Sequence, residues 1–227
     1  MNDADAARLR LFQLVSPALP VGAFSYSEGL EVLVQRGSVG DGEALERWLS
    51  DELSRGAVAV EAAGLSVLQR SLGLSESGGA DFGAVQALDG WLLAQREAAD
   101  VRAQQRQMGH SLLQLLSDLG FPLTSGPAAL AWPGAFAWAA VCLDIISPAV
   151  EEAYLYSWVA NQISAAVRLV PLGPTQGQRL QLGLAPLIAQ RARYLAVRDP
   201  RDLWNGGIGA GLAQLQHAEL YSRLFRS

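Results

Sequence analysis

Hydrophobic side chains recur along most of the chain at the three- and four-residue spacing of an amphipathic α-helix. Two segments rich in Pro, Gly and Ser interrupt this pattern: SPALPVGAFSYSEGLE (16–31) and PLGPTQGQ (171–178). No pair of segments alternates as a β-hairpin does, and no repeat of fixed period is found. The pattern therefore predicts an all-α fold, a single-domain bundle of roughly eight to ten helices over residues 1–227.

The apolar stripes and the capping residues place the expected helices. SESGGADFG (75–83) is the clearest loop, and TSGP (124–127) ends another element. The first few residues, 1–5, are expected to be flexible. We expect a helix over 5–15, a short helix capped by Ser27, and a long helix from Asp41 through Gly56 to Leu68. The further expected helices are 84–119, 134–146, one that starts at Ser147–Pro148 and runs to Val170, 179–196 with an interruption at Pro186, and 212–225.

The composition excludes several function classes. Half of the residues are hydrophobic and 17% are charged, which is typical of a globular domain rather than a disordered chain. The net charge of −5 does not indicate a protein that binds nucleic acid. All 17 basic residues are arginine. Without a lysine the chain has neither a Walker-type phosphate loop nor a Schiff-base residue.

The first residues, the longest apolar run and the cysteine content indicate where in the cell the protein is located. The start MNDADAARLR has early acidic residues and no apolar core, unlike a secretion signal. The longest apolar run, Ala128–Leu143, is shorter than the roughly 20 residues that cross a membrane. Cys142 is the single cysteine and suits a reducing compartment. We therefore expect a cytoplasmic protein.

Candidate catalytic and metal-binding groups are few. Ser25 lacks the G-x-S-x-G elbow that exposes a nucleophile. The two histidines, His110 and His217, are far apart in sequence and show no metal-ligand spacing. We therefore predict no catalytic residue, no metal site and no tightly bound cofactor. The competing hypothesis is a helical serine hydrolase that uses Ser25 with one of the two histidines.

Three other features indicate interaction surfaces. The loop 16–31 combines rigid prolines and small residues with two aromatic side chains, Phe24 and Tyr26, that are expected to be exposed. Arg102, Arg106 and His110 share one helix face at i, i+4 and i+8. This face is either an ordinary solvated surface or a docking strip for acidic groups. Near residue 227, Leu224 and Phe225 lie between two arginines, in a position where chains usually fray. Both side chains are therefore expected to be buried, in this core or in a partner.

Three segments resemble a known family. SPALPVGAFSYSEGLE (16–31) resembles the N-terminal signature of the urease accessory UreF family. RLVPLGPTQGQRLQLGL (168–184) resembles its second loop-and-helix motif, and HAELYSRLFRS (217–227) resembles its C-terminal ending. The three segments follow the family's order and span nearly the whole chain. Two residues depart from the family pattern, Glu28 in the signature and Pro174 in the second motif.

The resemblance implies an all-helical, non-catalytic chaperone that helps to insert nickel into urease. Members of the family bind the accessory protein UreD (UreH in some systems) and recruit the GTPase UreG. They typically form homodimers, and the complex docks on apo-urease. Nickel is therefore expected to be handled transiently by the whole complex.

The resemblance also implies two partner surfaces. The UreD/UreH partner is expected to order the tail, 221–227. Arg102, Arg106 and Arg179 are, by their chemistry, candidates for an arginine that acts on the GTPase. The expected GTPase-side residues are Phe24, Tyr26, Ser27, Glu28, Glu31, Gln176 and Arg179, and the expected UreD/UreH-side residues are Tyr221, Arg223, Leu224, Phe225 and Arg226.

Overall fold

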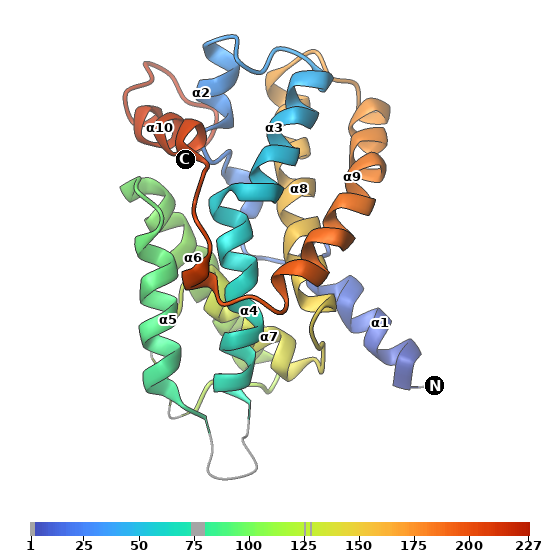
Figure 1. Ribbon diagram of the computed structural model, residues 1–227, viewed down its shortest axis with the longest axis vertical. Coiled ribbons are helices and arrows are strands. Elements are labelled where there is room, and N and C mark those ends of the chain that lie inside the picture. Colours follow the sequence, from blue (N-terminus) through green and yellow to red (C-terminus); the bar gives the residue numbers. More distant parts are fainter. Residues whose placement is uncertain (1–2, 74–79, 125, 128) are drawn as a thin grey trace.

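A computed structural model describes residues 3–73, 80–124, 126–127 and 129–227 (Figure 1). Within these ranges the chain is helical and contains no strand, so the all-α prediction is confirmed. The elements are α1 (Asp3–Leu14), η1 (Ala23–Ser25), α2 (Leu30–Gln35), α3 (Gly42–Arg55), α4 (Ala57–Leu72), α5 (Phe82–Ala94), α6 (Ala99–Asp118), α7 (Trp132–Cys142), α8 (Ala149–Leu169), α9 (Pro174–Leu195), η2 (Pro200–Asp202) and α10 (Ile208–His217), where η denotes a 3₁₀-helix.

Helix α4 forms the centre of the bundle (Figure 1). It packs against α3, α5, α7, α8 and α9, and every residue from Ala57 to Ser66 is buried. Its sequence explains this position, because a helix that is apolar on all sides is stable only inside a core. Glu61 is the one charged residue in that buried stretch.

Two of the expected long helices are each divided. The predicted helix 84–119 is wrong, because α5 ends at Ala94 and α6 begins at Ala99. Between them Arg96 turns inward to pair with buried carboxylates. The predicted continuation through Gly56 is also wrong: Gly56 is extended and separates α3 from α4. The start at Asp41 is confirmed, because its side chain accepts the Ala44 N–H at 2.8 Å.

Other helix boundaries also differ from the predictions. Helix α9 begins at Pro174, inside the expected loop, and continues through Pro186. Pro186 cannot bond the Leu182 carbonyl, but Leu182 is 77% exposed, so water can satisfy that group. The last helix spans Ile208–His217 rather than 212–225. Helix α7 spans Trp132–Cys142 rather than 134–146, and α8 begins at Ala149, one residue after Pro148.

Helix α1 extends away from the body and contacts α8 (Figure 1). Its apolar residues Leu9 and Phe12 are more than half exposed. Parts of the expected flexible start (1–5) and of the loops 75–83 and 124–127 lie outside the described residues. Within the described ranges, no helix combines the length and the apolar character that a membrane crossing requires.

Candidate functional site

The loop before α2 has an unusual backbone. Gly22, Glu28 and Gly29 have positive φ angles of 74°, 51° and 87°. At Gly29 a side chain would be both strained and obstructed, since a Cβ there would lie 2.9 Å from the backbone nitrogen of Gln214 in α10. The loop and α10 can therefore approach closely only because position 29 is glycine.

The last residues of the chain bind this loop. The main-chain oxygen of Ser227 accepts the N–H groups of Ser27 and Glu28 at 2.7 and 3.1 Å, and the Ser27 hydroxyl at 2.8 Å. The Arg226 N–H donates to the Ser25 carbonyl at 2.9 Å. Ser27 thus binds the tail rather than capping a helix, and α2 begins after Gly29. We call residues 25–31 with 224–227 the tail clasp.

Glu31 completes the tail clasp. Its carboxylate accepts the backbone N–H groups of Leu224 and Phe225 at 2.7 and 3.1 Å. The same carboxylate lies 3.2 Å from Nε2 of His217, which is fully buried. Such charge-assisted bonds to backbone N–H groups are stronger than neutral ones.

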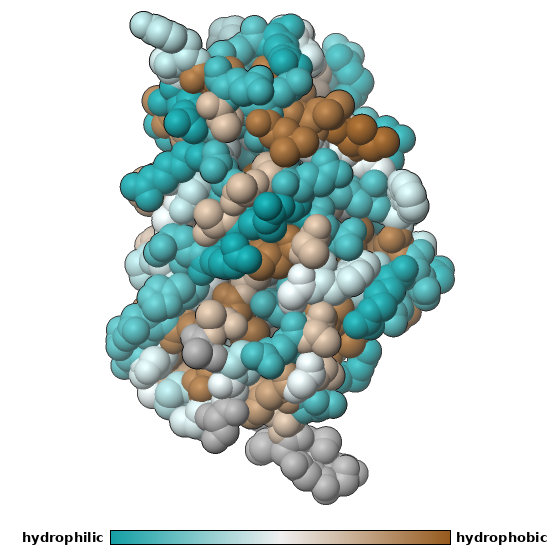
Figure 2. Space-filling view, turned by 90° about the vertical axis from the view of Figure 1, so that its left-hand side faces the viewer, coloured by the Kyte–Doolittle hydropathy of each residue, from teal (hydrophilic) through white to brown (hydrophobic). Residues whose placement is uncertain are grey.

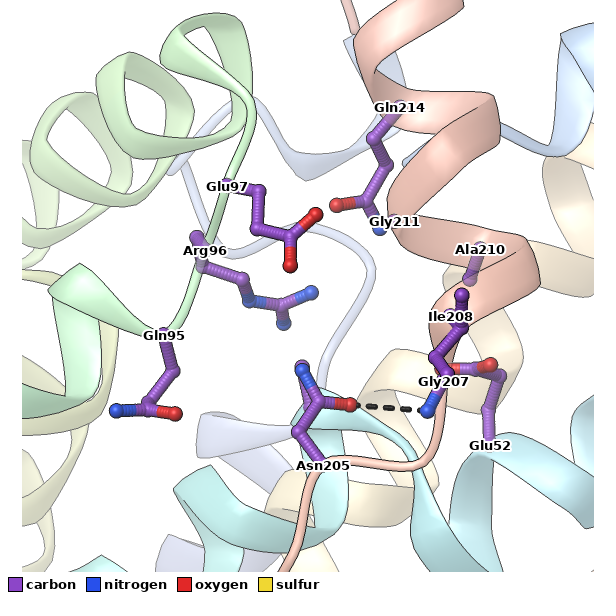
Figure 3. Close-up of a pocket in the computed structure, with 11 residues that line it drawn as sticks. Glu52, Gln95, Arg96, Glu97, Asn205, Gly207, Ile208, Ala210, Gly211 and Gln214 are labelled. Atoms are coloured by element: carbon purple, nitrogen blue, oxygen red, sulfur yellow. Dashed lines mark hydrogen bonds between the residues drawn. The ribbon is translucent and has the colours of Figure 1, made fainter.

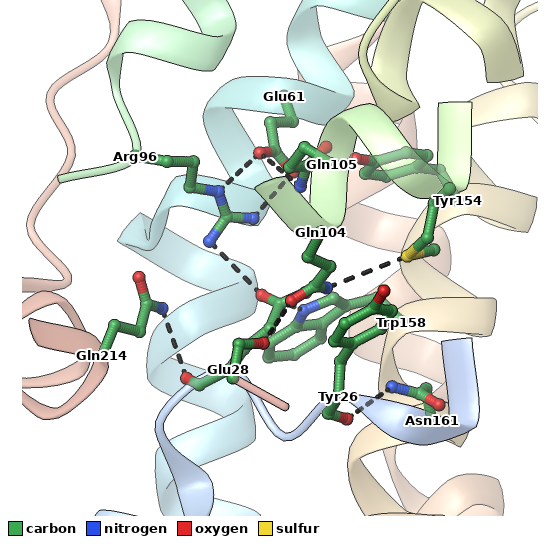
Figure 4. Close-up of polar contacts among 12 residues, drawn as sticks. Tyr26, Glu28, Glu61, Arg96, Gln104, Gln105, Tyr154, Trp158, Asn161 and Gln214 are labelled. Carbon is green, nitrogen blue, oxygen red and sulfur yellow. Dashed lines mark hydrogen bonds and ion pairs between the residues drawn. The ribbon is translucent and has the colours of Figure 1, made fainter. Parts of the chain in front are cut away.

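A buried ion cluster lies next to the clasp (Figure 4). Arg96 donates to both oxygens of Glu61 at 2.6 and 2.9 Å and to Glu28 at 3.3 Å. All three side chains are at least nine-tenths buried. Burial alone would lower the pKa of Arg96, but the charges of Glu61 and Glu28 outweigh it and raise that pKa.

Neutral donors surround these carboxylates. The Tyr154 hydroxyl donates to Glu61 at 2.8 Å; burial, followed by the Glu61 charge, raises the Tyr154 pKa well above its usual value. Trp158 and Gln104 donate to Glu28 at 3.2 and 2.8 Å. Gln104 also accepts the Ser227 hydroxyl at 2.6 Å, so the ion cluster and the tail clasp form one network.

A cavity of about 40 Å³ lies on the other side of Arg96 (Figure 3). Its lining includes Glu52 from α3, Glu97 beside Arg96, and Asn205 and Gln214. Glu52 is 7% exposed, and burial raises its pKa to about 7 although the Arg96 charge opposes the shift. Among the described residues its carboxylate has neither a hydrogen bond nor an ion pair closer than 4 Å.

A larger groove of about 810 Å³ opens between the loop before α2 and helices α1, α6, α8 and α9. Phe12 and Phe24 lie on its lining together with Arg168, and Glu28 and Glu61 also border it. The ion cluster therefore borders the groove through its carboxylates and the small cavity through Arg96.

The expected GTPase-side residues divide into two groups. Phe24 is 70% exposed, and Gln176 and Arg179 are exposed on α9. The interpretation of Tyr26 as an exposed aromatic is wrong, because it is 6% exposed. The other three residues assigned to this surface, Ser27, Glu28 and Glu31, are also buried, since they bind the tail and Arg96.

The expected UreD/UreH-side residues also divide. Tyr221, Arg223, Leu224 and Arg226 are exposed, and Arg223 lies 3.9 Å from Asp100. Phe225 is buried within this chain, with the Arg168 guanidinium 4.5 Å from its ring centroid. Residues 224–227 thus form direct contacts with the rest of this chain.

Of the proposed docking strip on α6 (Arg102, Arg106 and His110), one residue forms hydrogen bonds within the chain. Arg102 donates to the carbonyl groups of Arg96 and Glu97 at 2.6 and 2.7 Å, which makes it a support for that segment. Arg106 and His110 are exposed. In the described part of the chain Ser25 forms no side-chain hydrogen bond with either histidine, so the hydrolase hypothesis gains no support.

The sequence patterns did not reveal Glu52, Glu61, Arg96 and Tyr154 as members of the site. Two of them had a signal. Glu61 stands alone in the apolar run AVAVEAAGLSV, and Glu52 continues the apolar stripe of Leu45 and Leu49. A charge in such a position requires a buried partner. Arg96 had no comparable signal, because its segment follows no periodic pattern.

Comparison with known proteins gives the family. A family model described as UreF matches residues 39–185. Proteins named urease accessory protein UreF are 40% identical in Microcystis aeruginosa (96% of this chain, 97% of that protein) and 40% identical in Thermosynechococcus vestitus (98% and 99%). The protein of that name from Alkalilimnicola ehrlichii is 38% identical over 97% of this chain and 96% of its own length.

The chain belongs to the UreF family. The family inferred from the three segments is thereby confirmed. In this UreF-family chain, the first and last of those segments are the two halves of the tail clasp, and the second forms the start of α9.

Proposed function

We propose that this UreF-family protein is a non-catalytic chaperone of the cytoplasm that assembles a nickel-insertion complex on apo-urease. It binds UreD/UreH through the exposed part of the tail and the GTPase UreG near Phe24, Gln176 and Arg179. Two copies associate within the complex. Nickel is cargo that passes between the partners.

The tail clasp is the observation that carries this proposal. It joins the first and last signature segments, so the two proposed partner surfaces share one buried network. A protein bound at the exposed tail would therefore act directly on the loop that carries Phe24. Such coupling is what a scaffold for two partners needs.

The available chemistry supports a scaffold rather than a catalyst. The chain has no lysine for a phosphate loop, so hydrolysis of GTP requires a partner. Among the described residues, no group of three or more His, Cys, Asp or Glu side chains is placed to hold a metal ion. Nickel handling accordingly falls to the complex as a whole.

Co-expression with UreD/UreH and UreG from the same genome, followed by size-exclusion chromatography with light scattering, tests the proposal. The surface variants are Tyr221→Ala for the tail and Phe24→Ala/Arg179→Ala for the GTPase side. Because these side chains are exposed, their loss leaves the core intact. We expect the first variant to lose UreD/UreH and the second to lose UreG.

Val197→Ser serves as the control, since Val197 is 81% exposed and lies just after α9, at the opposite end of that helix from Gln176 and Arg179. It should retain both partners. A wild-type chain that bound neither protein would refute the scaffold function, and retention of both partners by all variants would refute the assigned surfaces.

A further inference from the structure

Helix α10 exposes an apolar face. Ile208, Leu212 and Leu215 recur at i, i+4 and i+7 and are 69%, 51% and 45% exposed, and Trp204 just before the helix is 84% exposed. Figure 2, which looks onto this side of the molecule, shows apolar side chains gathered in its upper part. A contiguous patch of this kind on a folded protein marks an interaction site.

The apolar face adjoins the cavity beside Arg96. Ile208 belongs to both, since it lines the cavity and lies on the exposed face (Figure 3). Glu97 is exposed at the same place, and Arg102 holds its backbone through the carbonyl group. A partner that covers α10 would therefore also close the cavity.

The charges in this region do not balance. Glu28, Glu52 and Glu61 surround a single guanidinium, that of Arg96, which is already committed to Glu28 and Glu61. Glu52 borders the cavity, is 93% buried and has no partner in the described part of the chain. A buried carboxylate without a partner is costly, and one additional cation would compensate it.

The size of the cavity selects the cation. At about 10–15 Å³ for each water-sized group, about 40 Å³ accommodates roughly three such groups. An ammonium with its last two methylenes has three heavy atoms and suits this space better than a guanidinium, which has four heavy atoms in a rigid plane. The chain contains no lysine, so a second copy cannot supply such a side chain.

We propose that the apolar face of α10 docks a different protein, which inserts a lysine side chain into the cavity so that its ammonium pairs with Glu52. The inference rests on the proposed function, because the partner is the accessory protein assigned above to the adjoining tail. The apolar face supplies the dry contact area, and the lysine supplies the specificity.

This pairing makes the association depend on pH. The groups that act on Glu52 are Arg96 and Glu28 from neighbouring segments and Asp51 and Arg55 from its own helix, and Glu97 lines the same cavity. Because the pKa of free Glu52 is about 7, its carboxylate is mostly ionised at pH 8 and mostly protonated at pH 6. A lysine that requires the ionised form should bind about tenfold more tightly at pH 8 than at pH 6.

The test uses the full chain and the UreD/UreH protein of the same genome. The Kd is measured at pH 6 and pH 8 for the wild type, Glu52→Gln and Glu46→Gln. Glu46 is the control, since it is exposed on the same helix and its loss changes the net charge equally.

A second experiment cross-links the complex with a carbodiimide, which joins carboxylates to amines as amides and takes up the water as it becomes a urea. Mass spectrometry identifies the joined residues, and any linked lysine must belong to the partner.

We expect Glu52→Gln to bind at least tenfold more weakly at pH 8 and to lose most of the pH dependence, while Glu46→Gln matches the wild type. A partner lysine linked to Glu52 or Glu97 would locate the contact. Equal affinities and pH profiles for the wild type and Glu52→Gln would overturn the lysine pairing while leaving the scaffold function intact. Absence of any wild-type complex would instead overturn both.

Discussion

Glu31 accepts the backbone N–H of Phe225 at 3.1 Å, although 194 positions separate the two residues in sequence. The same carboxylate accepts the N–H of Leu224, so one side chain binds two consecutive N–H groups of the tail. In an irregular segment such N–H groups have no helical or strand partner, and Glu31 supplies their acceptor. The apolar ring of Phe225 is buried as a result.

Replacing Glu31 should therefore release the tail. In Glu31→Ala the buried N–H of Phe225 and the partly buried N–H of Leu224 lose a charged acceptor, and His217 loses its partner. We expect the free energy of unfolding to fall by about 3 kcal/mol. Hydrogen exchange should accelerate at least 100-fold at residues 224–227. Glu219→Ala removes an exposed carboxylate of the same region and should change neither quantity.

A second prediction concerns Arg96. Arg96→Met keeps much of the side-chain volume but leaves Glu28 and Glu61 buried without a cation. We expect a loss of about 3–5 kcal/mol in urea denaturation at pH 7. Arg106→Met, on the exposed face of α6, should change stability by less than about 0.5 kcal/mol. An equally small loss in Arg96→Met would mean that the cluster contributes little.

The local rules of helix formation predicted the fold class well. Apolar periodicity located most of the helices, and the cap at Asp41 was placed correctly because its bond to Ala44 is local. Two of the errors have a common physical source. The predicted helix 84–119 is interrupted where the side chain of Arg96 bonds to Glu61. The last helix ends before residue 225, and the N–H groups of Leu224 and Phe225 donate to Glu31 instead of to helical carbonyl groups.

The site could be predicted only in part. The signature loop and the tail were recognised, but sequence spacing gave no sign that Ser27 would bind Ser227, a contact across 200 residues. The exposure of Tyr26 was misjudged for the same reason, since the elements that cover it are distant in sequence. Glu52 and Glu61 were detectable as charges on apolar helix faces, whereas Arg96, the cation that pairs with Glu61, was not.

The third prediction is a pH dependence of stability caused by Glu52. In the unfolded chain this carboxyl titrates near its ordinary pKa of 4.5, whereas burial in the folded chain raises that pKa to about 7. Between these values the folded state binds more protons, so the free energy of unfolding falls as pH rises. The stabilisation of the folded state by the proton on Glu52 is fully present below pH 4.5, and roughly 3 kcal/mol of it is lost by pH 8.

Glu52→Gln removes this titration. The variant and the wild type should be similarly stable at pH 4.5, and the variant should be more stable by roughly 2–3 kcal/mol at pH 8. Urea denaturation at several pH values measures the difference. Glu46→Gln should follow the wild-type profile, and a pH-independent difference between the wild type and Glu52→Gln would contradict the raised pKa.

The last prediction separates two effects of glycine at positive φ. Gly22 and Gly29 have φ angles of 74° and 87°, but only Gly29 faces a neighbour that a Cβ would meet. Gly22→Ala should cost about 1 kcal/mol, the penalty for a left-handed backbone. Gly29→Ala should cost at least about 2 kcal/mol more, because α10 and its Gln214 must move away. That movement should also loosen the tail clasp, so residues 224–227 should exchange hydrogen faster in Gly29→Ala alone. Equal effects of the two substitutions would mean that α10 yields easily and that the close approach at Gly29 does not hold the clasp together.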